Sequence, residues 1–221
     1  MNTDQLIDHL AERLSPVQPL RSPAVRAFMW LSGATAFVGL VAFSMTSPTD
    51  LATNGTGPGF VVPQLLAVAT AILAAWAAFR SVVPGSSRTA LVWPLVAGVA
   101  WIGSLATGMR PVEPGGLVAP REWMCVAVIV LSSGPLAAAL WVLLRRGAPL
   151  HPAVTAALGG LSIGVLANVA ACVSHPHTNN AVTLVWHGAT IAALVGGAAL
   201  TGHLVLKWDP RRFPAPETEA R

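Results

Sequence analysis

The sequence predicts an all-α polytopic membrane protein with six transmembrane helices and a short cytoplasmic amphipathic helix at its N-terminus. The 221 residues are 54% hydrophobic and only 10% charged, whereas about a quarter of the residues of a soluble domain are charged. The charged side chains lie at the two ends or in short gaps, and each uncharged segment is close to the ~20 residues that cross a hydrocarbon core as a helix. No segment shows the charged stripe of a soluble surface helix. The segments expected to span the membrane are residues 27–45, 60–79, 89–109, 123–144, 150–173 and 181–206.

The first predicted element is residues 2–14, NTDQLIDHLAERL, which have the pattern of a short amphipathic helix. Asn2 or Thr3 can cap its start. One face is apolar and carries Leu6, Ile7, Leu10 and Leu14. The other face is charged and carries Asp4, Asp8, Glu12 and Arg13. Helices that rest on a membrane surface usually present Lys and Arg to the lipid; because this helix is mostly acidic, it favours a groove in a protein partner over the membrane surface.

The loops predict the orientation and the domain limits. The N-terminus, the second and fourth gaps between spans and the C-terminal tail hold eleven Lys and Arg residues, and the other three gaps hold two. This bias places both ends of the chain in the cytoplasm, and it accounts for the pI near 10.5 without nucleic-acid binding. We therefore divide the chain into a cytoplasmic binding segment with a proline-rich linker, a six-helix membrane domain and a disordered cytoplasmic tail, at residues 1–25, 26–208 and 209–221.

Small and aromatic residues predict how the spans are positioned. Glycines let transmembrane helices approach closely, and we expect this of Gly160, Gly164, Gly196, Gly197 and Gly202. Tryptophans gather at membrane interfaces, and three lie near the predicted span ends, namely Trp30, Trp123 and Trp208.

The side chains with the most chemistry gather at the predicted outer face. The stretch ACVSHPHTNNAVTLVWH, residues 171–187, interrupts two apolar spans and contains Cys172, His175, His177 and His187. With the orientation above, Cys125 begins the fourth span on the same side, and Asn168 lies one helical turn from Cys172. We expect these side chains to share one shallow layer that solvent can reach.

This layer permits three interpretations. Thiolate and imidazole suit soft or borderline cations such as zinc, copper or cadmium, and the candidate metal ligands are Cys125, Cys172, His175 and His177. The two thiols could instead form a disulfide if their Cα atoms lie within about 7 Å. Both could also be structural residues, because a cysteine is often a small buried hydrophobe. The sequence does not require a metal or any other cofactor.

Three segments resemble the NrsF-like integral-membrane anti-sigma factors. They are TDQLIDHLAERLSPVQPLRSPAVRAFMW at residues 3–30, VPGSSRTALVWPL at 83–95 and LRRGAPLHPAVTAALGGL at 144–161. The N-terminal segment, with its D-x-L-I-D-x-L core and Pro-Leu-Arg linker, is the most specific of the three, and the similarity extends over nearly the whole chain.

The resemblance implies a protein of the bacterial inner membrane that holds an extracytoplasmic-function (ECF) sigma factor inactive through its N-terminal segment and releases it on metal or oxidative stress. It assigns the sigma-factor contact to the stripe Leu6, Ile7, Leu10 and Leu14, with Asp4 and Asp8 on the same helix. It assigns sensing to Cys125 and Cys172, beside which we place His175, His177 and His187. The implied partners are the sigma factor and the lipid bilayer, and no direct nucleic-acid binding is expected.

Two other classes of function compete with this one. A small transporter or a metal-binding membrane protein is the alternative, but ion-coupled carriers usually keep a charged residue inside the membrane, and the six predicted spans hold none. A membrane enzyme would find no carboxylate in the spans for acid–base chemistry. His187 and His203 are 16 residues apart, about 24 Å along a helix, so they cannot hold one haem. The sequence therefore does not predict an enzyme.

Overall fold

The computed structural model describes residues 2–12, 20–46, 49, 57–107, 109, 111, 120–147, 149–174 and 180–206. These residues form seven α-helices and one short 3-10 helix: α1 (Thr3–Glu12), α2 (Pro23–Met45), α4 (Pro58–Ser81), η1 (Arg88–Leu91), α5 (Val92–Ala106), α6 (Pro120–Leu144), α7 (Pro152–Ser174) and α8 (Asn180–Val205). Six segments are long and apolar enough to cross a membrane, and α5 reaches that length together with η1. The prediction of an all-α fold with six transmembrane helices is confirmed.

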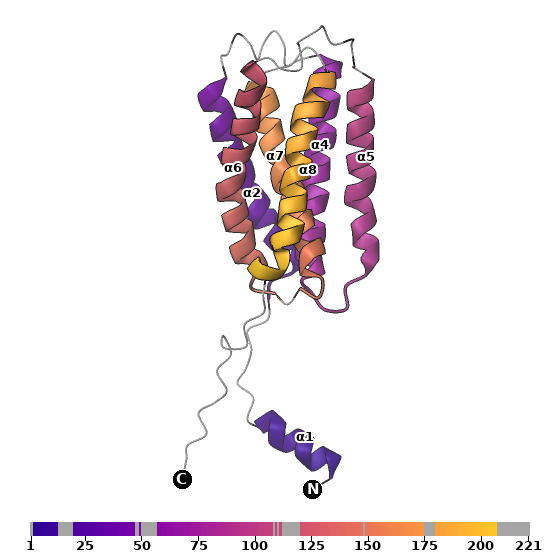
Figure 1. Ribbon diagram of the computed structural model, residues 1–221. Coiled ribbons are helices and arrows are strands. Elements are labelled where there is room, and N and C mark those ends of the chain that lie inside the picture. Colours follow the sequence, from indigo (N-terminus) through magenta and orange to yellow (C-terminus); the bar gives the residue numbers. More distant parts are fainter. Residues whose placement is uncertain are drawn as a thin grey trace.

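The six spans run up and down in one bundle (Figure 1). The starts of α2, α5 and α7 and the ends of α4, α6 and α8 lie at the same end of the bundle, drawn at the bottom of Figure 1. We call it the basic end, because it carries Arg26, Arg80, Arg145 and Arg146. We call the opposite end the cysteine end. The short helix α1 lies outside the bundle, beyond the basic end.

Prolines mark the starts of four spans, α2, α4, α6 and α7. Proline suits the first turn of a helix because its fixed φ angle is already helical and the N–H that it lacks would have no partner there. At α2 the Ser22 hydroxyl also caps the helix and accepts a hydrogen bond from the Val25 N–H at 3.4 Å. As a result α2, α4 and α6 begin a few residues before the uncharged segments, and Arg26 lies inside α2.

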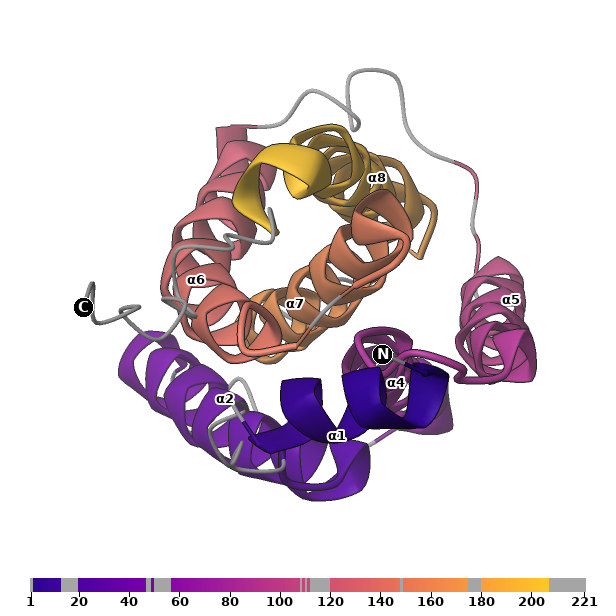
Figure 2. The same cartoon turned by 90° about the horizontal axis from the view of Figure 1, so that it is seen from below.

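Helix α7 is the centre of the bundle. Of its span 72% is buried, against 11% for α8. It packs against α2, α4, α6 and α8, whereas α5 lies at the edge beside α4 (Figure 2). Hydroxyl groups join α7 to α4: Ser162 donates to the carbonyl of Ala71 at 2.7 Å, and the hydroxyls of Ser81 and Thr155 are 2.8 Å apart. The residues of α7 together therefore contact four other spans.

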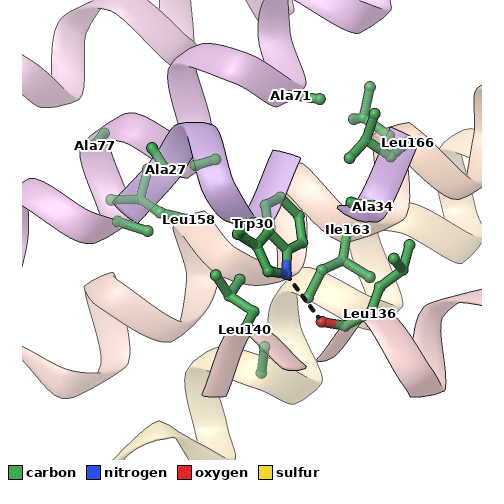
Figure 3. Close-up of a cluster of buried hydrophobic side chains, with 14 of the residues drawn as sticks. Ala27, Trp30, Ala34, Ala71, Ala77, Leu136, Leu140, Leu158, Ile163 and Leu166 are labelled. Atoms are coloured by element: carbon green, nitrogen blue, oxygen red, sulfur yellow. Dashed lines mark hydrogen bonds between the residues drawn. The ribbon is translucent and has the colours of Figure 1, made fainter. Parts of the chain in front are cut away.

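The predicted interfacial role of Trp30 is wrong. Its side chain is only 4% exposed and lies in the main hydrophobic cluster, where its indole N–H donates to the Leu136 carbonyl of α6 at 3.4 Å (Figure 3). A buried indole needs such a partner, and α6 provides it. Trp123 is exposed at the start of α6, as an interfacial residue would be, and Trp208 lies outside the described residues.

Glycines allow close contact between α7 and α8, as predicted for three of the five positions. A Cβ at Gly160 would lie 3.0 Å from the Ala198 Cβ, and one at Gly202 would lie 2.7 Å from the Pro152 carbonyl oxygen. Gly164 also faces α8, at Ile191. The prediction is wrong for Gly196 and Gly197, because a Cβ at either position would have no atom within 4 Å.

This difference predicts that a change of glycine to alanine has opposite effects at two positions of α8. We expect Gly202→Ala to lower the free energy of unfolding by about 1–3 kcal/mol, because the new methyl group collides with the backbone of α7. Gly196→Ala is the matched control, and we expect it to be neutral or stabilising because alanine favours a helix. Thermal unfolding of the purified protein in detergent measures both. Equal stability of the two variants would contradict the predicted collision.

Candidate functional site

Five polar side chains from four helices come together inside the cysteine end of the bundle. We call them the thiol cluster: Gln64 of α4, Cys125 of α6, Asn168 and Cys172 of α7, and His187 of α8. Cys125 lies in the second turn of its helix, Cys172 lies in the last turn of α7, and His187 lies about two turns into α8. The antiparallel order of the spans places all of them at the same level, as the sequence predicted for the cysteines and His187.

Asn168 is the residue that organises the cluster. Its Oδ1 atom lies 2.7 Å from Nδ1 of His187, and because a carboxamide oxygen can only accept, the imidazole carries a proton on Nδ1 and donates it. The Cys172 thiol donates to the same oxygen at 3.7 Å, and its sulfur is 3.6 Å from His187 Nδ1. One oxygen atom on α7 thus fixes the orientation of a thiol on its own helix and an imidazole on α8.

Gln64 and Cys125 complete the surroundings of Cys172. The Gln64 side chain hydrogen-bonds Cys172, and Cys125 is near enough for an electrostatic interaction with it. Gln64 Oε1 is buried and has no hydrogen-bond partner within the described part of the chain. The two cysteines are not joined by a disulfide. Gln64 is not a residue that we predicted, although a lone carboxamide among the apolar residues 60–79 is a signal that could have identified it.

Four of the five members of the thiol cluster are buried, so the prediction of a solvent-accessible layer is wrong for the two cysteines, Asn168 and His187. Gln64 is half-buried. Cys125 and His187 are each 1% exposed, Asn168 is 1% exposed and Cys172 is 4% exposed. The reason is the central position of α7, whose neighbours cover the last turn of that helix. A bulky reagent cannot reach these thiols without movement of a helix, whereas a metal ion or a small oxidant needs far less space.

The predicted metal ligands are only partly described. His175 and His177 lie outside the described residues, and within the described ranges no group of three His, Cys, Asp or Glu side chains could hold a metal ion. Among the described residues, the members of the thiol cluster do not form such a group by themselves. A site that combines Cys125 and Cys172 with His175 and His177 stays a prediction.

The predicted binding helix at the N-terminus forms as α1. Asn2 caps it as predicted: the Gln5 N–H donates to Asn2 Oδ1 at 2.8 Å, and Gln5 Oε1 accepts from the Asn2 N–H at 3.0 Å. Leu6 and Ile7 are 42% and 57% exposed, and the two aspartates of the helix, Asp4 and Asp8, are exposed as well. The side chain of Leu10 and all of Leu14 lie outside the described residues.

Comparison with known proteins bears out the resemblance. A family model described as NrsF, negative regulator of sigma F, matches residues 10–208, a range that contains all six spans and the thiol cluster. Leu6 and Ile7 precede the matched range. No curated protein and no solved structure gave a significant match. The chain therefore belongs to the NrsF family and is a multi-pass membrane protein that negatively regulates a sigma factor.

Proposed function

We propose that the protein is an anti-sigma factor of the bacterial inner membrane that binds an ECF sigma factor through α1 and releases it when a metal or an oxidant acts on the thiol cluster. One observation carries this proposal: an exposed apolar helix face lies beyond one end of the bundle, and a buried group of two thiols, an imidazole and a carboxamide lies inside the other end. This division suits a protein that detects a signal on one side of a membrane and acts on the other.

The properties of α1 support its role as the binding segment. A helix of ten residues is marginal in water by itself, and the reciprocal Asn2–Gln5 cap reduces the cost of ordering it on a partner. Its exposed Leu6 and Ile7 are suited to a hydrophobic groove, which is a common way for proteins to bind an amphipathic helix.

The arginines support the proposed orientation. Arg26, Arg80, Arg145 and Arg146 share the basic end, and short loops rich in Arg and Lys remain in the cytoplasm. This orientation places α1 in the cytoplasm, where a sigma factor is present, and the thiol cluster near the periplasm.

The position of the cysteines supports a sensing role. Cys125, Cys172 and His187 belong to α6, α7 and α8, so a bond formed among them changes how three helices contact one another. A signal shifts a conformational equilibrium only through its different affinity for the two states, and a covalent bond or a metal–thiolate bond provides a large difference.

Substitution of the α1 stripe tests the proposed partner contact. We expect Leu6→Asp combined with Ile7→Asp to weaken the binding of the sigma factor roughly 30-fold or more, because loss of an anchor residue from an interface costs about 2 kcal/mol or more. The measurement is co-purification of the full-length variant with candidate sigma factors, followed by titration.

The control is His9→Asp, which adds one negative charge, half of what the double variant adds, at an exposed position outside the stripe. Binding should change less than threefold in this variant. If the double variant retained its sigma factor at full affinity, α1 would not be the binding segment.

A further inference from the structure

Arg26 is a buried cation whose hydrogen bonds are incomplete. Its side chain is 6% exposed, although a guanidinium group stays charged in proteins. Nη2 donates to the carbonyl of Leu143 in the last turn of α6, and the guanidinium carbon lies 5.0 Å from the centre of the Phe79 ring of α4. Nη1 is buried and has no hydrogen-bond partner among the described residues. The three helices thus hold the group in place and leave one of its donors unused.

The charge of Arg26 is not balanced by the described residues either. The side chain whose charge acts on it is Arg146, which is also positive and is exposed just after α6. The acidic residues described at this end, Asp4, Asp8 and Glu12, are exposed on α1. Burial of an unpaired cation in a membrane protein is costly, so an anion between Arg26 and Arg146 would stabilise this end of the bundle.

Two further side chains at the basic end also have a buried donor atom that lacks a hydrogen-bond partner among the described residues. Arg80 Nε, in the last turn of α4, and Trp141 Nε1, near the end of α6, are buried without a partner in the described structure. All three groups at this end are donors. Each of these donors lacks an acceptor within the part of the chain that the structure describes, and the positive charge of the two arginines favours an anion in that role.

We propose that the basic end of α2, α4 and α6 binds the phosphate of an anionic phospholipid, with Arg26 and Arg146 as its ligands. Guanidinium groups form short, charge-assisted and often bidentate hydrogen bonds to phosphate oxygens. The site lies at the ends of the spans, at the depth of lipid headgroups, and basic pockets between spans on the cytoplasmic side commonly bind such lipids. Arg146 is exposed and reaches a headgroup from outside, and Arg26 holds it from within. This proposal does not need the sigma-factor function, and it shares with the proposed function only the cytoplasmic orientation of the basic end.

The test uses the full-length protein in lipid nanodiscs. Phosphatidylcholine discs receive increasing fractions of phosphatidylglycerol at constant ionic strength, and the thermal unfolding midpoint is followed as a function of the anionic lipid. For the wild type we expect the unfolding midpoint to rise with the fraction of phosphatidylglycerol and then to saturate. Loss of a hydrogen bond to a charged group should lower the apparent lipid affinity of Arg146→Gln and of Arg26→Gln at least roughly tenfold each.

Arg145→Gln is the matched control. It removes the same charge from the neighbouring residue, whose Nε donates to the Val205 carbonyl at 2.6 Å, and the lipid affinity should change less than threefold. Arg146 is exposed, so its variant decides the outcome even if Arg26→Gln folds poorly. The proposed site would be overturned if Arg145→Gln and Arg146→Gln lost lipid affinity equally. It would also be overturned if the unfolding midpoint of the wild type showed no saturable rise with the anionic lipid. The same rise in phosphatidylcholine discs with inorganic phosphate would overturn the assignment to a lipid.

Discussion

Replacement of Cys125 and Cys172 together by serine is expected to abolish induction of the sigma-dependent promoter by cadmium and by peroxide. To move a two-state equilibrium from 1% to 99% released, a signal must favour the releasing state by about 5.5 kcal/mol. Two thiols can provide this, because they form soft-metal bonds or a disulfide. When the disulfide forms, two S–H bonds are lost, two electrons pass to the oxidant and two protons are released. Serine hydroxyls form no disulfide and are poor ligands for soft metals.

The basal state of this variant should remain silent, because a serine at position 172 can still donate to Asn168. Ser174→Ala is the matched control: Ser174 is buried in the same last turn of α7, but its hydroxyl donates to the Ala170 carbonyl of its own helix at 2.8 Å. Induction should be unchanged in that variant. A reporter assay in cells measures all three proteins, and full induction of the double serine variant would remove the thiols from the mechanism.

The spans and their order were predictable from charge and length alone. An uncharged segment of about 20 residues has few alternatives to a transmembrane helix, and the antiparallel order then placed Cys125, Cys172 and His187 at one level. Because of prolines at their first positions, α2, α4 and α6 begin a few residues before the spans that the sequence predicts. Pro23 brings Arg26 into α2, although the uncharged segment expected to span the membrane begins only at residue 27.

Burial was not predictable, because it depends on which helix faces meet. Helix α7 carries no charged side chain on any face, so its sequence contains no charged stripe that shows which face is exposed. The structure places this helix in the centre, which buries Cys172 and Asn168 where solvent exposure was expected. The same reason explains Trp30, which is near a span end but packs against α6 and donates to the Leu136 carbonyl. Arg26 is buried in a similar way, with the Leu143 carbonyl of α6 as its acceptor.

The thiol cluster shows what a single sequence does and does not contain. In the sequence, Cys and His indicated the site, because these residue types are typical of sensors. Gln64 was missed because a lone carboxamide in a span has many ordinary explanations, and its contact with Cys172 depends on the packing of α4 against α7. The residue types therefore predicted the level of the site, and the helix contacts decided its composition.

Asn168→Leu is expected to lower the free energy of unfolding by about 2–3 kcal/mol. Hydrogen bonds between transmembrane helices average only about 0.6 kcal/mol, but this substitution removes an oxygen that accepts from both His187 and Cys172. His187 is 1% exposed, and a buried donor that loses its acceptor adds a penalty of about 1–3 kcal/mol. Leucine has the same number and branching of side-chain heavy atoms as asparagine, so the change leaves no cavity. Denaturant unfolding in detergent micelles provides the measurement.

A double-mutant cycle separates this polar penalty from general damage to α7. We expect Asn168→Leu combined with His187→Leu to be less destabilising than the sum of the two single changes by about 1–2 kcal/mol, because residues that share a hydrogen bond couple at this scale and no orphaned imidazole remains. Ser162→Ala is the control for an ordinary interhelical bond, since its hydroxyl donates to Ala71 at 2.7 Å, and it should cost about 0.6 kcal/mol. Strict additivity of the two changes would show that Asn168 does not hold His187, and the thiol cluster would then lack the residue that orients it.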